Sequence, residues 1–252
     1  MSPTLAAVVL SFNEERHIGA CLDSLAWADR RVVVDSFSSD RTVEIARGRG
    51  AEVVQRPFAD FASQRNAALD AVEAEWVLFV DADERATPAL AAEVRRVLAG
   101  GVCAGWWIPR HNVLVGHRMR GAGWFPDPQL RLLHRGQARY DPSRPVHEVV
   151  ILDGPAGTLD NVLIHYNYDS VGQFLRKQNR YAEYEARILD ERGVRVRPWT
   201  YVTMPLREFW RRFVTLRGYL DHIYGLLFST LLAYYTLVAY WRLRRLRRAR
   251  FA

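Results

Sequence analysis

Short apolar runs alternate with helix-like segments through the first hundred residues, and this alternation limits the fold more than any other feature. Buried strands are typically runs of roughly four to eight apolar residues, whereas amphipathic helices repeat their apolar residues at intervals of three and four. The order strand, helix, strand, helix predicts a mostly parallel sheet with helices on both faces, an α/β fold. The expected strands are Leu5–Leu10, Arg31–Val34, Glu52–Gln55 and Trp76–Val80.

Helices are expected between and after these strands. The first helix is capped by Asn13, and its apolar face is Ile18, Leu22, Leu25 and Ala26. The second is capped by Ser39 or Asp40, and the third is Phe61–Val72. The fourth runs from Pro88 to Leu98, with Thr87 as its cap and Gly100–Gly101 after its end. After Val102 we expect strands at Trp106–Ile108 and Leu130–Leu133, a long loop between them, and a helix from Ser170 to Glu191. Long loops in compact domains are often functional.

Composition adds broad limits. A chain of 252 residues is long enough for one large α/β domain and an appendage. Its two cysteines, Cys21 and Cys103, form no disulfide framework. Since no signal peptide is recognisable at the N-terminus, we expect a cytosolic main domain.

The stretch Trp76–Glu84, WVLFVDADE, combines a buried strand with two carboxylates. Asp81 and Asp83 follow the strand, and ligands in open α/β sheets bind just outside the carboxyl ends of strands. Such hard oxygen ligands suit Mg²⁺ or Mn²⁺ holding a diphosphate. The alternative is a strand that simply ends in an acidic turn.

Four ordered segments carry a family resemblance: VVLSFNEERHIGACLDSL, VVVDSFSSDRT, QRNAAL and FVDADE. They resemble family-2 glycosyltransferases of the GT-A fold, above all the bacterial branch that includes the lipopolysaccharide core β-glucosyltransferases. The likeness covers nearly the whole chain, including a VHE-type segment, a His-Tyr pair and an apolar C-terminal stretch. We therefore expect a GT-A-like domain over residues 1–195, and a membrane-associated helical region with a basic tail over residues 196–252.

The resemblance implies a nucleotide-sugar site, with a UDP-sugar as donor. Asp35 would accept a hydrogen bond from the base, which suits the ring N–H of uracil. Asn13 and Glu14 would line the nucleotide pocket, although Asn13 is also a plausible helix cap. Arg65 would balance the charge of the diphosphate; a solvated helix face is the alternative.

The same resemblance assigns the catalytic groups. Asp83 would bind Mn²⁺ or Mg²⁺ directly, Asp81 would contact the ribose or metal-bound water, and His165 would complete the coordination. Glu148 would deprotonate the acceptor hydroxyl, since a sugar hydroxyl is a poor nucleophile; Asp127 is the second candidate for this base. The implied reaction is an inverting, metal-dependent transfer of a hexose.

The C-terminal region combines apolar and basic residues. Ile223–Trp241 contains no charged residue and would form a helix about 28 Å long, barely the hydrocarbon thickness. Arginines flank it on both sides, which opposes a single crossing from the cytosol. We expect a peripheral or shallowly inserted region on anionic lipid, at the cytoplasmic face of the inner membrane, with a lipid-linked glycan as acceptor. A buried core helix and a single span remain alternatives.

Competing functions fit less well. A polyprenyl-phosphate glycosyltransferase is the nearest rival, because its acceptor is already ionised. A haloacid-dehalogenase phosphatase would need Thr or Val where Arg85 stands, and a dinucleotide-binding enzyme would need glycines where SFNEER stands. A nucleotidyltransferase would need a glycine-rich basic loop there. A basic tethering or nucleic-acid-binding protein would fit the tail alone, so no nucleic-acid partner is expected, and the oligomeric state stays open.

Overall fold

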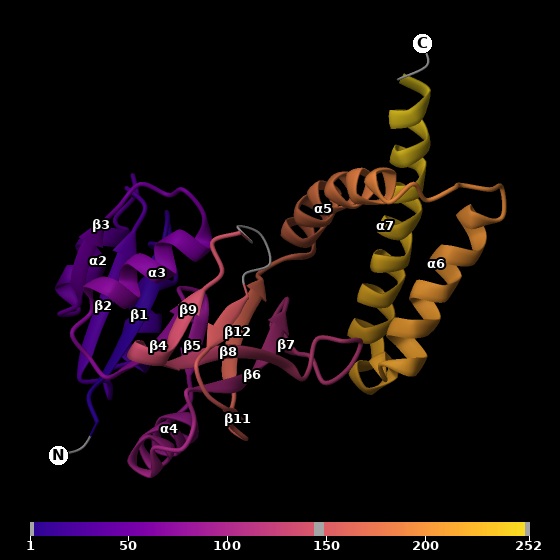
Figure 1. The fold of residues 1–252 in the computed structure, drawn as a ribbon. Helices are drawn as coiled ribbons and strands as arrows, with labels where there is room; N and C mark the ends of the chain where they lie inside the picture. The colour runs from indigo at the N-terminus through magenta and orange to yellow at the C-terminus, as the bar shows by residue number, and fades with distance from the viewer. Residues whose placement is uncertain (1–2, 144–148, 250–252) are drawn as a thin grey trace. The chain divides into compact units, whose positions relative to one another are not determined.

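The computed structural model describes residues 3–143 and 149–249, which form two compact units (Figure 1). The first unit comprises residues 1–110 and 128–165, and the second comprises residues 111–127 and 166–252. Within the second unit, α5 (Val171–Glu191) packs against α7 (His222–Ala249), and the domain boundary between residues 195 and 196 stays a prediction. Membrane association of the C-terminal region stays a prediction.

The first unit begins with the predicted strand–helix alternation. Its elements are β1 (Leu5–Ser11), α1 (Ile18–Ser24), β2 (Arg30–Asp35), α2 (Thr42–Gly48), β3 (Glu52–Gln55), α3 (Phe61–Ala71) and β4 (Trp76–Asp81). The pairs β2–β3, β1–β2 and β1–β4 are parallel. In register, Ser11 pairs with Asp35 and Leu10 with Asp81, so the four strands end at one edge of the sheet.

Later strands extend this sheet with antiparallel pairs. The remaining elements of this stretch are β5 (Glu84–Ala86), α4 (Pro88–Gly100), β6 (Gly105–Leu114), β7 (His117–Arg118), β8 (Asp127–His134), η1 (Arg135–Gln137), β9 (Ala138–Tyr140), β10 (Val150–Leu152), β11 (Ala156–Thr158) and β12 (Leu163–Tyr168). The strand order is β3-β2-β1-β4-β8-β6-β12-β5, with β4–β8 and β12–β5 antiparallel. The long loop predicted after Ile108 is shorter than expected, because β6 continues to Leu114 and pairs with β7.

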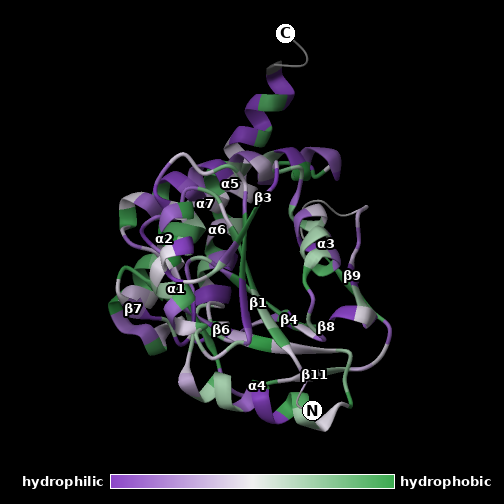
Figure 2. Ribbon diagram, turned by 90° about the vertical axis from the view of Figure 1, so that its left-hand side faces the viewer, coloured by the Kyte–Doolittle hydropathy of each residue, from purple (hydrophilic) through white to green (hydrophobic). Residues whose placement is uncertain are grey.

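Alternate residues of the central strands face two separate cores. Leu5, Ala7 and Val9 of β1 pack on the side of α1 and α4, and Ala6 and Val8 pack on the side of α3. Because side chains alternate along a strand, a strand covered on both faces must be apolar throughout. Figure 2 shows β1 and β4 in the green of hydrophobic residues. This packing explains why the parallel strands are recognisable from sequence.

Helix ends follow the predicted capping only in part. Thr87 accepts a hydrogen bond from the Leu90 amide and Gly101 is left-handed with φ 58°, as predicted for α4. The prediction of Asn13 as a cap is wrong, because α1 begins at Ile18 and Asn13 lies in a loop with φ 55°. Asp40 accepts from the amide of Thr42, two residues on, which is a turn contact just before α2.

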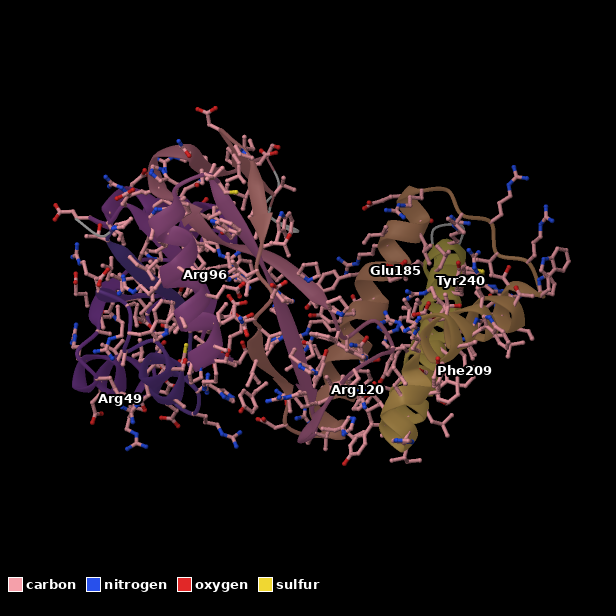
Figure 3. The ribbon with its side chains drawn as sticks, turned by 90° about the horizontal axis from the view of Figure 1, so that it is seen from below. Arg49, Arg96, Arg120, Glu185, Phe209 and Tyr240 are labelled. Atoms are coloured by element: carbon pink, nitrogen blue, oxygen red, sulfur yellow. The ribbon has the colours of Figure 1, made fainter. Side chains whose placement is uncertain are left out.

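The second unit is mainly helical. After α5 it contains α6 (Thr200–Trp210), a π-helical turn η2 (Arg211–Thr215), a 3-10 turn η3 (Gly218–Asp221) and α7, which packs against both α5 and α6. Tyr240 of α7, Glu185 of α5 and Phe209 of α6 mark these helices in Figure 3. Among the described residues, one helix, Gly218–Arg248, is long and apolar enough to cross a membrane.

Candidate functional site

Polar side chains gather at the edge where the parallel strands of the first unit end. Ser11, Asp35 and Asp81 are the last residues of β1, β2 and β4. Since the three strands are parallel neighbours, their ends meet at one edge, the place where open α/β sheets bind ligands. The sequence-predicted residues Asn13 and Glu14 follow β1 directly.

Two loops at this edge are bound to each other. Asn13 donates its amide to Ser38 Oγ at 2.9 Å and accepts from the Ser39 amide at 2.9 Å. The amide of Glu14 donates to Thr42 Oγ1 at 2.7 Å. Asn13 adopts a left-handed backbone, which few residues other than glycine do and which is frequently stored at functional sites. The loop after β1 is therefore held in one shape by the loop after β2.

Asp35 lies fully buried beneath these loops. Its carboxylate accepts hydrogen bonds from Ser11 Oγ at 3.1 Å, from the Ser38 amide at 2.9 Å and from Gln55 Nε2 at 3.3 Å. Both oxygens thus have partners within the protein, and a base N–H at this position would share them. The role predicted for Asp35 in base recognition stays a prediction.

Asp81 is surrounded by arginines. Arg131 donates to both of its carboxylate oxygens, Arg65 Nη2 lies 3.2 Å from Oδ1, and Arg110 Nη1 lies 3.9 Å from Oδ2. Burial opposes the charge of this carboxylate, but Arg131 and Arg65 outweigh it and hold the pKa of Asp81 well below its usual range. Asp81 is therefore ionised at every physiological pH.

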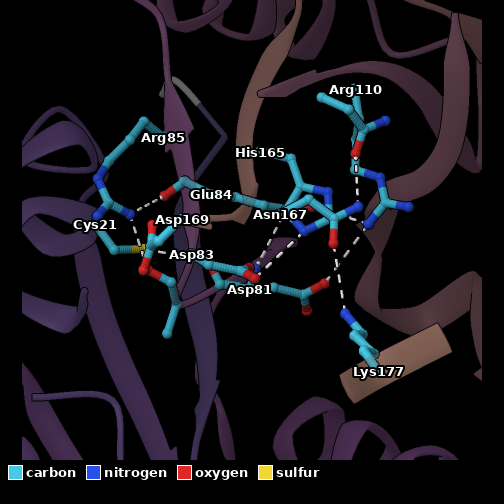
Figure 4. A network of polar contacts seen from close by, with 12 residues as sticks. Cys21, Asp81, Asp83, Glu84, Arg85, Arg110, His165, Asn167, Asp169 and Lys177 are labelled. Carbon is cyan, nitrogen blue, oxygen red and sulfur yellow. Dashed lines mark hydrogen bonds and ion pairs between the residues drawn. The ribbon is translucent and has the colours of Figure 1, made fainter. Parts of the chain in front are cut away.

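Glu84 completes this charged cluster and is fully buried. It accepts a hydrogen bond from the Asp81 amide at 2.9 Å and lies 3.3 Å from Arg110 and 3.6 Å from Arg131 (Figure 4). Burial raises its pKa, and the charge of Asp81 adds to this shift in spite of Arg131 and Arg110. The three arginines face two carboxylates, so the cluster carries one net positive charge when both are ionised.

Asp83 and His165 meet beside this cluster. His165 Nε2 lies 3.3 Å from Asp83 Oδ2, because β12 pairs with β5 and places His165 opposite Glu84 (Figure 4). The Asp83 side chain is 32% exposed and that of His165 is 11% exposed. Burial raises the pKa of nearby Glu14 to about 7, and the negative charges of Asp83, Asp40 and Asp81 contribute. The carboxyl groups of Glu14 and Asp83 thus lie close enough to influence each other at the place where the metal was predicted.

The donor set fits a divalent cation that shares its coordination with substrate. In the part of the chain that the structure describes, no group of three or more His, Cys, Asp or Glu side chains could hold a metal by itself. Mg²⁺ in nucleotide sites usually takes one or two carboxylates together with phosphates and waters, and imidazole suits Mn²⁺. The partly exposed Asp83 carboxylate and the His165 imidazole are compatible with either metal.

The two predicted candidates for the base are Glu148 and Asp127. Glu148 belongs to residues 144–148, which are outside the described residues. Asp127 begins β8 and belongs to the second unit, where its carboxylate accepts from Asn112 Nδ2 at 3.3 Å. Of the sequence-predicted residues, the first unit brings together Glu14, Asp81, Asp83, Arg65 and His165.

Sequence reasoning missed Glu84, Arg110 and Arg131. The signal for Arg131 was present, because an arginine interrupts the apolar run Leu130–Leu133 and is 4% exposed in the structure. A charged residue in such a strand needs a buried partner of opposite charge. Arg110 lies beyond the predicted strand end at Ile108, so its place beside Asp81 depends on the longer β6.

Comparisons with known proteins agree with this picture. Residues 6–166 match the family model described as Glycosyl transferase family 2. The chain is 29% identical to the lipopolysaccharide core biosynthesis glycosyltransferase LpsC of Rhizobium meliloti, over 91% of this chain and 90% of the relative. It is 25% identical to an uncharacterized glycosyltransferase of Rickettsia conorii, over 98% of this chain and 91% of the relative.

Solved structures show a similar fold. S. aureus TarS 1–349 superimposes with a TM-score of 0.51 at 16% identity, over 95% of this chain and 91% of that one. The structure of TarS 1–349 in complex with UDP superimposes with a TM-score of 0.50 at 18% identity, over 86% of this chain and 74% of that one. The predicted GT-A-like α/β fold is confirmed.

Proposed function

The chain belongs to glycosyl transferase family 2 and is a glycosyltransferase, and on that premise we propose an inverting, metal-dependent transfer of a hexose from a UDP-sugar to a hydroxyl of a lipid-linked glycan. The relative LpsC is named for lipopolysaccharide core biosynthesis, which supports such an acceptor. TarS has been crystallised with UDP and with UDP-GlcNAc, which supports a uridine nucleotide as donor.

One observation carries the proposal: Asp83 and His165, 3.3 Å apart, lie beside the arginine cluster at the carboxyl edge of the sheet. Asp83 and His165 would hold Mn²⁺ or Mg²⁺, which would neutralise the diphosphate leaving group when bound. Arg65, Arg110 and Arg131 place fixed positive charge nearby, and preorganised charge of this sign stabilises a leaving diphosphate.

The loops after β1 and β2 would form the nucleotide part of the site. Asn13 and Glu14 are held by Ser38, Ser39 and Thr42, so the loop is fixed before a nucleotide arrives. Asp35 would accept from the base N–H in place of one of its present donors. Asp81, paired with Arg65 and Arg131, would contact the ribose or metal-bound water.

Glu148 would take the proton of the acceptor hydroxyl as the new glycosidic bond forms, with Asp127 as the second candidate. A carboxylate suits this step because the hydroxyl is a weak nucleophile until its proton is removed. The acceptor would reach the enzyme at the cytoplasmic face of the inner membrane. The apolar, arginine-flanked C-terminal helices support attachment to that surface.

Thermal shifts with nucleotides test the donor site. We expect UDP with Mn²⁺ to raise the melting temperature, and GDP, CMP and dTDP to raise it less. A ligand at 100 times its dissociation constant stabilises by about 2.7 kcal/mol. The Asp83→Ala variant should lose the response, because it removes the exposed carboxylate. The matched control is Asp70→Ala, which removes a 63% exposed carboxylate of α3 that pairs with Arg139.

Three results are informative. A shift that needs Mn²⁺, survives in Asp70→Ala and vanishes in Asp83→Ala supports the proposal. If UDP raises the melting temperature equally with and without Mn²⁺, and equally in the wild type and in Asp83→Ala, metal-dependent binding through Asp83 is ruled out. No response to any nucleotide rules out the donor site.

A further inference from the structure

Helix α6 carries an apolar stripe that faces solvent. None of its residues is buried, in contrast to α5 and α7, which bury several residues each. The stripe consists of Trp199, Val202, Leu206 and Trp210, which are 58–63% exposed. Intervals of three and four residues place these side chains on one face of the helix. A soluble helix normally turns such a face inward.

Positive charge borders the stripe. The Arg197 guanidinium lies 5.3 Å from the centre of the Trp199 ring, and Arg207 and Arg211 are exposed at the other end of α6. At about 100° per residue, Arg207 lies beside the stripe, whereas Glu208 lies opposite it and Arg211 points toward Glu208, with which it pairs. Glu208 is the one acid in α6 and is neutralised by Arg211 and Arg212, at 2.7 and 2.8 Å. The exposed side of α6 is thus apolar and cationic.

The apolar helix α7 packs along a highly charged neighbour. Tyr235 donates its hydroxyl to the Leu175 carbonyl at 2.9 Å, and Arg242 donates to the Asn179 carbonyl at 2.7 Å. Near the end of α7, Arg247 donates to Asp190 at 2.8 Å. Residue numbers rise together in these contacts, from Leu175 with Tyr235 to Asp190 with Arg247, so α5 and α7 run in the same direction. The charged residues of α5 are Arg176, Lys177, Arg180, Glu183, Glu185, Arg187, Asp190 and Glu191.

A helix with this many charges does not enter hydrocarbon, because each charge at the bilayer centre costs several kcal/mol. While Tyr235, Arg242 and Arg247 keep their hydrogen bonds to α5, this half of α7 stays beside the charged helix, which opposes a crossing of the bilayer. Packing within the second unit accounts for part of the apolar surface of α7, since Phe228, Ala239 and Leu243 are buried there.

We propose that α6 lies in the plane of an anionic membrane surface, with Trp199, Val202, Leu206 and Trp210 inserted among the lipids, and that α7 stays on the protein side. This inference rests on the proposed function, which needs a lipid-linked acceptor, and it names the element that meets the lipid. Tryptophan at both ends of a short apolar face and arginines beside it are the pattern of an interfacial helix. The cationic border favours an anionic lipid surface over a second copy of this basic chain.

Vesicle sedimentation with the full chain tests the proposal. We expect binding to equimolar phosphatidylcholine and phosphatidylglycerol and much weaker binding to phosphatidylcholine alone, since each arginine near the surface contributes to anionic attraction. Leu206→Ser and Trp210→Ser should each lower the partition coefficient about tenfold or more, because each removes a large inserted side chain. Tyr184→Ser, which removes a 54% exposed side chain from α5, is the matched control and should bind as the wild type does.

Alkaline carbonate extraction separates an interfacial helix from a span. We expect the wild type to be released from the vesicles, whereas a chain that remains in the pellet would overturn the placement of α7. The proposal is also overturned if both α6 variants bind vesicles like the wild type. It is overturned too if they bind less but convert a lipid-free dimer to a monomer, since the stripe would then join two copies.

Circular dichroism confirms that each variant is folded. The UDP response in thermal shifts should persist in Leu206→Ser and Trp210→Ser, because no residue proposed for the donor site belongs to α6. Variants that lose vesicle binding but keep a normal UDP response therefore show that the lipid-binding role of α6 is separate from the donor site. A missing UDP response in the wild type would instead contradict the proposed function.

Discussion

Arg131 stands in an apolar strand, and its side chain is only 5% exposed. Its guanidinium contacts Asp81 through both terminal nitrogens and lies 3.6 Å from Glu84. A planar guanidinium can bridge two carboxylates in this way, whereas a lysine ammonium is a single point charge. Arg131 therefore sets the position of Asp81, and with it the turn that presents Asp83.

Replacing Arg131 by methionine should strongly destabilise the first unit. Removing one partner of a buried ion pair leaves uncompensated charge, which costs about 3–5 kcal/mol. The measurement is urea unfolding followed by tryptophan fluorescence. Arg139→Met is the control, because Arg139 and its partner Asp70 are both more than half exposed and such pairs contribute about 1 kcal/mol or less. Equal losses for the two variants would mean that water solvates the Arg131 cluster.

At the scale of single elements, α4 shows how local sequence determines where a helix begins and ends. Thr87 caps its start, Pro88 supplies the first helical residue, and Gly101 ends it in the left-handed region at φ 58°. Neither Gly100 nor Gly101 has a heavy atom within 4 Å of where a Cβ would stand. The two adjacent glycines therefore differ in backbone conformation and not in packing.

Alanine substitutions at these glycines should have opposite effects. Gly101→Ala forces an L-residue into the left-handed region and should cost about 1–2 kcal/mol in the free energy of unfolding. Gly100→Ala lies within the helix, where alanine is favoured by about 0.5–1 kcal/mol. Thermal or urea unfolding of the two variants measures the difference. If both changed stability in the same direction, the helix would end at another residue in solution.

At the scale of the whole molecule, each unit is assembled from two separated stretches of chain. In the second unit, the buried Asp221 joins its two stretches. Its carboxylate accepts from the amides of Arg120 and Gly121, both at 2.8 Å, and lies 3.0 Å from His117 Nε2. His117 in turn stacks on Tyr224, with ring centres 4.3 Å apart. Residues 111–127 thus depend on a carboxylate a hundred positions away.

Asp221→Ala should loosen this segment. The amides of Arg120 and Gly121 would lose their acceptor, and an unsatisfied buried donor costs about 1–3 kcal/mol. Hydrogen exchange followed by mass spectrometry should show faster exchange in residues 117–123, with β1 to β4 unchanged. Glu183→Ala, in which an exposed carboxylate of α5 loses its pair with Arg187, should leave residues 117–123 protected. Unchanged exchange in Asp221→Ala would show that packing alone holds the segment.

Local pattern was sufficient for the parallel strands and for α3, α4 and α5, whose apolar spacing and caps predicted their bounds to within a few residues. It was insufficient for Asn13, which looked like a cap but makes its hydrogen bonds to Ser38 and Ser39. The length of β6 also escaped prediction, because its polar end is held by pairing with β7. Contacts between residues far apart in the chain decided both cases.

By itself, the sequence determined the α/β alternation, the family and the position of Asp81 and Asp83 at a strand end, because these depend on local periodicity and on ordered motifs. Tertiary structure alone decided that Arg65, Arg110 and Arg131 converge on Asp81, and that His165 meets Asp83. It also decided that α7 is held along the charged helix α5 while the stripe of α6 is left exposed. The physical reason is that charge pairing and burial depend on which distant segments pack together, and one-dimensional spacing does not contain that information.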